Sequence, residues 1–193
     1  MVYLQQTLQT DYPFLANPFA DVDLLTPFIE TYWVEKDGFF KNDAQDDRVF
    51  LSADANVIPY WLGVVKDKKM HLASINAIRK EKLDQPFPLK YHAFLNSNWV
   101  HWGARIMIPN YQGDSIWTMM GPIYIEQQSE FYPSEARQHL ETYIKLIEKY
   151  RTYVEVFAPD GRSPLRGRFG HDFETGMLWA AMIPPLIEKL GTK

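Results

Sequence analysis

The chain of 193 residues contains no cysteine. This absence excludes disulfide bonds, thiolate nucleophiles, and zinc or iron–sulfur sites that depend on cysteine ligands. The sequence also lacks an uncharged apolar run of about 18 residues, which a membrane-spanning helix requires. Its first residues show neither the basic start nor the apolar run of a secretion signal. We therefore expect a cytoplasmic protein with no membrane partner.

Motifs that carry well-defined chemistry are missing as well. The five histidines are scattered, and no two have the spacing that places both imidazoles on one metal ion. The sequence has no Gly-x-Ser-x-Gly elbow and no Gly-x-x-x-x-Gly-Lys phosphate loop. The glycines between 161 and 176 match no dinucleotide fingerprint, and the nearby Asp172 and Glu174 would repel a phosphate. These observations predict no cofactor and no bound metal, and they favour a binding protein over an enzyme.

The composition is that of a folded protein. Hydrophobic residues make up 46% of the chain and charged residues 23%, which is typical of globular domains and far from disordered sequences. No repeat and no flexible linker interrupts the sequence. We expect one globular domain over residues 1–193, in which residues 1–20 form an irregular arm that contains proline.

Hydrophobic periodicity predicts both helices and strands. Apolar residues at helical spacing predict helices over 23–34, 67–83, 134–151 and 177–183. The third is the best supported, because Pro133 and Glu135 are typical of a helix start. Alternating or β-branched residues predict strands over 48–52, 57–65, 99–108, 116–126 and 152–158. Together these elements predict an α+β fold, with a mainly antiparallel sheet and two or three helices packed on one face.

Charge is distributed unevenly along the chain. Residues 1–63 hold ten acidic side chains against three basic ones, a net charge of −7, whereas the remainder holds 17 basic against 14 acidic, a net charge of +3. An acidic half disfavours nucleic acid and suits a basic protein surface, although a solvated face that only improves solubility explains the same charges. Aromatic rings beside carboxylates are typical of protein interfaces. The candidate partner-binding residues are Glu35, Asp37, Phe39, Phe40, Asp43, Asp46 and Asp47.

The loop 160–176 concentrates arginines and carboxylates between two hydrophobic segments. A metal-dependent phosphodiesterase or nuclease needs two or three carboxylates beside a cation, and this loop contains those residue types. The alternative is a structural latch, in which the arginines bind neighbouring carboxylates and Asp172 caps the following helix. If the protein is an enzyme, the candidate catalytic residues are Glu155, Asp160, Asp172, Glu174, His171, Arg166 and Arg168.

Three functions therefore stay open. The leading hypothesis is a protein-binding module, such as an inhibitor or immunity protein, that neutralises a basic partner enzyme through its acidic, aromatic-flanked face. The first alternative is the metal-dependent hydrolase. The second is a structural subunit of a larger bacterial or phage assembly, which would use the proline-containing segment 11–27 for docking.

Overall fold

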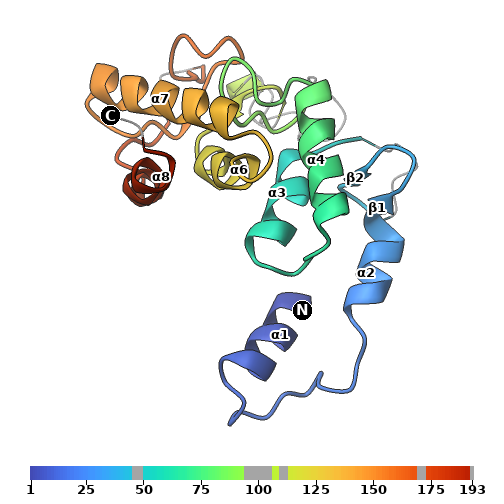
Figure 1. Cartoon of the computed structure of the whole chain (residues 1–193). Coiled ribbons are helices and arrows are strands. Elements are labelled where there is room, and N and C mark those ends of the chain that lie inside the picture. The colour runs from blue at the N-terminus through green and yellow to red at the C-terminus, as the bar shows by residue number, and fades with distance from the viewer. Residues whose placement is uncertain (45–49, 94–105, 109–112, 169–172, 192–193) are drawn as a thin grey trace. The chain divides into compact units, whose positions relative to one another are not determined.

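The computed structural model describes residues 1–44, 50–93, 106–108, 113–168 and 173–191. These residues form seven α-helices, one 3₁₀-helix and two small two-stranded sheets (Figure 1). The protein is 49% helical and 9% strand. The predicted α+β fold with a mainly antiparallel sheet is therefore wrong, because helices dominate and no large sheet exists among the described residues.

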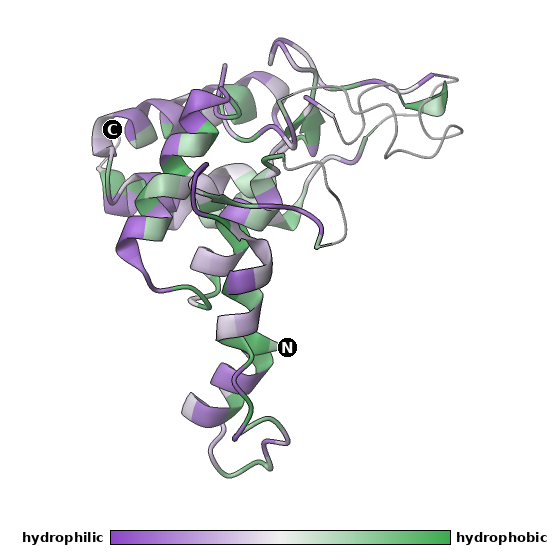
Figure 2. Ribbon diagram, turned by 90° about the vertical axis from the view of Figure 1, so that its right-hand side faces the viewer, coloured by the Kyte–Doolittle hydropathy of each residue, from purple (hydrophilic) through white to green (hydrophobic). Residues whose placement is uncertain are grey.

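The chain divides into two compact units, Met1–Ala77 and Ile78–Lys193. Compact units within a chain need not fold independently, so the single domain expected over residues 1–193 stays a prediction. The helices carry both hydrophilic and hydrophobic residues along their length (Figure 2). Within the described part of the chain, no helix combines the length and the apolar character that a membrane crossing requires.

The described residues of the first unit form four helices and one small sheet. Strands β1 and β2 pair antiparallel, with Trp33 opposite Phe40. Gly38 makes the turn between them, and its φ of +72° is a conformation that residues with a Cβ rarely adopt. The elements are α1 (Val2–Thr10), α2 (Leu25–Tyr32), β1 (Trp33–Val34), β2 (Phe39–Phe40), α3 (Ala53–Trp61) and α4 (Lys68–Lys80), which extends into the second unit.

Two aspartates fix the starts of α2 and α4. Asp23 Oδ1 accepts hydrogen bonds from the first-turn amides of Leu25 and Thr26 at 3.1 and 3.0 Å. Asp67 Oδ1 accepts in the same way from Lys69 and Met70. These backbone hydrogen bonds stabilise the charged carboxylates and lower the pKa of both side chains. The helices predicted within 23–34 and 67–83 are confirmed, and their capping residues explain why.

The strand predicted over 57–65 is wrong, because α3 occupies most of this segment. Its β-branched and aromatic residues favour a strand, yet its buried residues Ala53, Asn56, Val57 and Tyr60 follow the helical period. Ser52 takes an extended conformation immediately before the helix. The burial of one helical face outweighs the local β propensity.

The core of the first unit is aromatic and is joined to α3 by one buried amide. Asn56 Oδ1 accepts hydrogen bonds from Phe40 N at 2.8 Å and Ser74 Oγ at 3.1 Å, while Nδ2 donates to the carbonyl oxygens of Phe40 and Ser52 at 2.9 Å each. The Asn56 side chain therefore uses all its hydrogen-bonding capacity inside the protein. Phe40, Tyr60, Val64 and Val65 form the buried cluster around it.

The described part of the second unit packs three α-helices, a 3₁₀-helix and a short sheet around its own core. Helix α7 confirms the helix predicted over 134–151 and buries Ala136, Leu140 and Tyr143. Strands β3 and β4 pair antiparallel, with Ile116 opposite Phe157. The elements are β3 (Ile116–Trp117), α6 (Met120–Gln128), α7 (Pro133–Tyr150), β4 (Val156–Phe157), the 3₁₀-helix η1 (Leu178–Met182) and α8 (Ile183–Leu190).

Proline positions account for further differences from the sequence predictions. The strand predicted over 116–126 ends at Trp117, and Pro122 lies in the first turn of α6, where the missing N–H leaves no hydrogen bond unmade. Pro184 and Pro185 likewise begin α8 rather than end the preceding helix. The strand predicted over 99–108 lies almost entirely outside the described residues.

Gly121 is required by the contact between α6 and α7. A Cβ at this position would lie 1.8 Å from Tyr143 Oη and 2.8 Å from the carbonyl oxygen of Pro88. Tyr143 is buried and donates its hydroxyl hydrogen to that same carbonyl oxygen. The side chain that would clash is therefore fixed in place.

We expect Gly121→Ala to lower the free energy of unfolding by about 1–3 kcal/mol through overpacking. Helix propensity alone predicts that this substitution raises the free energy of unfolding by about 1 kcal/mol, because alanine favours a helix more than glycine does. Urea unfolding followed by circular dichroism measures the change. The exposed Gln138→Ala on α7 is the control and should leave stability nearly unchanged. A Gly121→Ala variant as stable as the parent would contradict the close packing of these helices.

Candidate functional site

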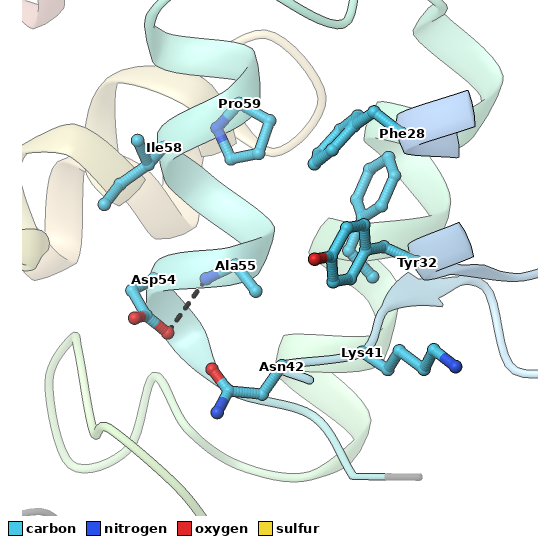
Figure 3. A pocket seen from close by; sticks show the side chains of 9 residues that line it. Phe28, Tyr32, Lys41, Asn42, Asp54, Ala55, Ile58 and Pro59 are labelled. Carbon is cyan, nitrogen blue, oxygen red and sulfur yellow. Dashed lines mark hydrogen bonds between the residues drawn. The ribbon is translucent and has the colours of Figure 1, made fainter. Parts of the chain in front are cut away.

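A cavity of about 310 Å³ lies between α2 and α3 in the first unit (Figure 3). This volume is at the lower end of the range of small-molecule pockets and is sufficient for a single side chain or a small ligand. We call this cavity the α2–α3 pocket. It is lined by Phe28, Tyr32, Phe40, Lys41, Asn42, Asp54, Ala55, Ile58 and Pro59.

One wall of the α2–α3 pocket is aromatic. Phe28 and Tyr32 are four residues apart on α2, so both rings project from the same side of the helix. The ring of Phe28 lies 5.4 Å from that of Tyr32 and stacks at 5.4 Å on Phe40. Phe40 is held in turn by an edge contact with Trp33 and by the backbone hydrogen bonds to Asn56. The wall is therefore preorganised by the core.

The opposite wall comes from α3 and changes from apolar to polar. Pro59 and Ile58 lie at one end, whereas Asp54 and Asn42 lie at the other (Figure 3). Asp54 Oδ1 accepts a hydrogen bond from Ala55 N at 2.9 Å. Asn42 Oδ1 accepts one from Ser52 Oγ at 3.1 Å. The pocket therefore offers an apolar half and a half with carboxylate and amide oxygens.

Lys41 lines the pocket with its carbon chain. Its ammonium group extends away from Asp54 and Asn42 (Figure 3). The hydroxyl group of Tyr32 points to the opposite side, toward α3 (Figure 3). The polar end of the pocket is therefore bordered by oxygen atoms rather than by the cation.

One residue of the segment predicted to bind a partner, Phe40, lines this pocket. Phe40 is only 1% exposed and forms part of the aromatic wall, while Phe39 is half-buried. Glu35 accepts a hydrogen bond from Trp33 Nε1 at 2.6 Å, which holds its carboxylate close to the sheet. The carboxylate of Asp37 lies 4.0 Å from Lys36 Nζ, a surface pair of little energetic value.

Asp43 is exposed and directly follows the pocket residue Asn42. Asp46 and Asp47 lie outside the described residues. Of the predicted segment, Phe40 therefore lines the α2–α3 pocket and Asp43 follows a pocket residue in the chain, whereas Glu35 and Asp37 lie in the connection between β1 and β2.

The alternative catalytic residues are only partly brought together. Glu155 and Glu174 lie side by side, because Glu155 N donates to the carbonyl oxygen of Glu174 and Glu174 N donates to a Glu155 carboxylate oxygen at 3.3 Å. Asp160 Oδ1 accepts a hydrogen bond from Arg162 N in a local turn. The remaining members are Arg166 and Arg168, which are exposed, and His171 and Asp172, which lie outside the described residues.

Backbone hydrogen bonds hold the described part of the charged loop. Ala158 N donates to Ser163 O, and Leu165 N donates to Val156 O at 2.9 Å. The Tyr150 hydroxyl donates to the carbonyl oxygen of Arg162. Across the described ranges, no three or more histidine, aspartate or glutamate side chains are grouped as metal ligands. The hydrolase and latch hypotheses both stay predictions.

A polar cluster in the second unit contains several described groups whose pKa values are shifted, among them Asp84, Tyr124 and His139. Burial raises the pKa of Asp84, whose Oδ2 accepts a hydrogen bond from Tyr124 Oη at 3.1 Å. Arg79 binds Glu135 through two hydrogen bonds, at 3.1 and 2.7 Å, and its guanidinium lies 3.8 Å above the ring of Tyr132. This cluster links α4, α6 and α7, and its side chains pair with one another, so it stabilises the second unit.

His139 belongs to the same cluster. Its Nδ1 lies 2.9 Å from Gln128 Oε1. Burial, opposed by the nearby Glu135 and assisted by Arg79, lowers its pKa to about 4. The imidazole is therefore neutral at pH 7, and its Nδ1–H donates to the amide oxygen.

Comparison of the sequence with models of known protein families gives no match, and comparison with curated protein sequences gives none either. The sequence placed Phe28 and Tyr32 within the helix predicted over 23–34 and did not connect them with Asp54. The pair of aromatic residues four positions apart is the local signal that points to a shared wall.

We expect His139 to make stability depend on pH between about 4 and 6.5. In this window the unfolded chain binds a proton at His139 and the folded protein does not, so the free energy of unfolding falls as the pH falls. In His139→Gln this contribution disappears. The stability advantage of the parent over the variant should therefore shrink by on the order of 2 kcal/mol between pH 7 and pH 4.5.

Urea unfolding of both proteins at pH 4.5, 5.5, 6.5 and 7.5 measures this difference. The raised pKa of Asp84 makes its own contribution to stability increase as the pH falls. Asp84 is present in both proteins, so this contribution cancels in the difference between them. A difference in stability that stays constant over this range would show that His139 keeps an ordinary pKa in the folded protein.

Proposed function

We propose that the chain is a protein-binding module that recognises a basic partner through the first unit. The observation that carries this proposal is that Phe40 and Asn42 of the acidic segment line the α2–α3 pocket, with Asp43 next in the chain. We define the recognition face as the pocket residues together with Glu35, Asp37 and Asp43. An aromatic pocket provides the buried anchor point of an interface, and the surrounding carboxylates orient a basic partner.

The distribution of charge supports the same proposal. All residues of the recognition face lie within residues 1–63, which carry a net charge of −7. Carboxylates around an apolar pocket accelerate the approach of a basic surface and disfavour acidic competitors. An inhibitor of a basic enzyme that acts in the cytoplasm would combine these features.

We expect Asp37→Asn combined with Asp43→Asn to weaken partner binding about three- to tenfold at low salt. Both side chains are exposed, so each contributes a modest, screened attraction. Affinity capture from the native lysate, with partners quantified by mass spectrometry at low and high salt, measures the effect. The matched control is Glu141→Gln combined with Glu148→Gln on the exposed face of α7, which removes two charges from the second unit.

The parent and the control should retain the same stoichiometric partner at low salt and release it at high salt. Equal retention by the Asp37/Asp43 variant, with an unchanged dependence on salt, would overturn the proposal. So would the absence of any stoichiometric partner at either salt concentration.

A second candidate function, a structural subunit of a larger assembly, is favoured by the N-terminal segment. Residues 1–22 expose many large hydrophobic side chains. Hydrophobic residues, in green, occur along the chain near the N-terminus (Figure 2). Polar contacts within this segment join its two ends: Gln5 Nε2 donates to the carbonyl oxygens of Phe19 and Val22, and Asn17 Nδ2 donates to the carbonyl oxygen of Gln5. The exposed residues are Met1, Tyr3, Leu4, Tyr12, Phe14, Leu15 and Val22.

If this segment mediates self-assembly, the purified chain should have a mass that is a multiple of 22.6 kDa. Phe14 is 79% exposed and Leu15 49% exposed, so Phe14→Ser combined with Leu15→Ser should restore the monomer without loss of stability. Size-exclusion chromatography with light scattering measures both masses. A monomeric parent at high protein concentration would remove the support for self-assembly.

A further inference from the structure

Every charged side chain in residues 1–35 is acidic. This part of the chain contains five carboxylates and no lysine, arginine or histidine. All five acidic side chains are exposed to solvent. A surface with this composition attracts cationic groups and repels anionic ones. We call residues 1–35 the anionic segment, and its carboxylates belong to Asp11, Asp21, Asp23, Glu30 and Glu35.

The anionic segment also turns hydrophobic side chains outward. Of the eleven large hydrophobic side chains that are exposed among the described residues, seven lie in residues 1–22. Helix α1 buries Gln5, whose amide binds two backbone carbonyl groups, and leaves Tyr3 and Leu4 each 47% exposed. This reverses the usual arrangement of a surface helix, in which the apolar side faces inward. Exposed apolar residues concentrated in this way indicate an interaction surface.

The second unit carries a surface of the opposite charge. Residues 145–168, which run from the last turns of α7 through the loop after β4 (orange in Figure 1), hold six basic side chains against three acidic ones, a net charge of +3. Lys149 Nζ and Tyr150 Oη both donate to the carbonyl oxygen of Arg162, which brings the end of α7 and the loop together. All six basic side chains are exposed. We call this the basic surface, formed by Lys145, Lys149, Arg151, Arg162, Arg166 and Arg168.

The carboxylates within the basic surface are engaged by backbone amides. Asp160 Oδ1 accepts a hydrogen bond from the amide of Arg162, and Glu155 Oε2 accepts one from the amide of Glu174. Within the described ranges, no ion pair or hydrogen bond involves the guanidinium groups of Arg162, Arg166 and Arg168. Each guanidinium has five N–H donors, so these side chains can bind carboxylates of another molecule.

Arginine binds aromatic rings as well as carboxylates, and one residue of this chain makes both contacts. Arg79 lies 3.8 Å above the ring of Tyr132 and forms two hydrogen bonds with Glu135. The anionic segment offers the same two components on its exterior, because exposed aromatic rings lie among its carboxylates. These rings belong to Tyr3, Tyr12 and Phe14.

Like charges disfavour a symmetric contact between two copies. Two anionic segments that faced each other would place five carboxylates against five without a cation, and two basic surfaces would repel each other in the same way. A lipid surface is disfavoured as well, because segments that bind anionic membranes depend on lysine and arginine. The charges therefore favour a contact between different surfaces of two copies.

We infer that the anionic segment of one copy docks on the basic surface of a second copy. The inference rests on the second candidate function, since it names the surface that receives the N-terminal segment of a subunit. The arginines bind exposed carboxylates such as Asp11 and Asp21 and pack against the ring of Phe14. A contact between two different surfaces is heterologous, so it builds closed rings or open chains.

The test combines two variants of the full chain, each defective in one surface. Phe14→Ser with Leu15→Ser removes apolar contacts from the anionic segment, and Arg162→Glu with Arg166→Glu reverses charge on the basic surface. All four positions are exposed, so the circular dichroism of both variants should match that of the parent. Size-exclusion chromatography with light scattering measures the masses.

The parent should assemble, whereas each variant alone should be a monomer of 22.6 kDa. An equimolar mixture of the two variants should form a dimer of twice this mass, because each contributes the surface that the other lacks. We expect the association of the parent to weaken at least about tenfold from low to high salt, as screening reduces the attraction. The control Lys66→Glu with Lys68→Glu makes the same change of charge at exposed positions of the first unit and should assemble like the parent.

Assembly of the Arg162/Arg166 variant to the mass of the parent would overturn the inference and leave self-assembly standing. So would two monomeric variants whose mixture stays monomeric, or loss of assembly in the control, which would show an effect of net charge alone. A monomeric parent would remove both the inference and the second candidate function. If that monomer binds a labelled single-stranded oligonucleotide through Arg162 and Arg166, the basic surface serves a polyanion instead. Capture of a basic partner that depends on Asp37 and Asp43 would still support the recognition face.

Discussion

The side-chain amide of Asn56 is the constraint on which the first unit depends. It satisfies both the N–H and the C=O of Phe40, and it also bonds to Ser52 and Ser74. These residues are fully buried or nearly so, so no water is in reach to replace a lost partner. Each buried group left without a hydrogen bond costs about 1–3 kcal/mol, and an apolar replacement of Asn56 would leave several.

This constraint extends directly to the α2–α3 pocket. Because Asn56 fixes the backbone of Phe40, the aromatic ring of Phe40 has a defined position against Phe28 and Trp33. Helix α3, which carries Asn56, also carries Asp54 and the apolar end of the pocket. The hydrogen bonds of Asn56 therefore connect α3, which forms one wall, to Phe40 in the aromatic wall. A rigid pocket of this kind loses little conformational entropy when it binds a partner.

The second unit uses similar chemistry for a different purpose. Its Asp84–Tyr124 and Arg79–Glu135 interactions connect side chains of the same unit and stabilise its helices. The most perturbed pKa values of the described residues lie in this unit, at Tyr124 and Tyr143. Perturbed pKa values often indicate an active site. Here burial within a packed helical core is sufficient to explain them.

The sequence predicted the helices that have strong local signals. Helix α7 has Pro133 and Glu135 in its first turn and a regular apolar stripe, and it forms where expected. The segments 57–65 and 116–126 were misassigned as strands because their β-branched content outweighed weaker helical spacing. The expected large sheet is absent from the described residues. Without that sheet, the α+β prediction was wrong.

The candidate site could be predicted only in part. The acidic segment was found from composition, because charge asymmetry is visible without a structure. The pocket beside it depends on contacts between residues 16 positions apart, such as Phe40 and Asn56, which no local pattern indicates. The sequence counted Asp54 only as one of ten acidic residues in 1–63. Its place in the pocket lining depends on the packing of α3 against α2.

The most direct test of this account is amide hydrogen exchange, followed by mass spectrometry, of the chain with and without the partner that it retains from its native lysate. The account predicts slower exchange in 25–44 and 53–61 on binding, with exchange in α7 unchanged. Protection confined to residues 1–22 would identify the N-terminal segment as the docking site. Protection confined to 155–168 would place recognition in the charged loop, and either result would contradict a recognition face built on the α2–α3 pocket.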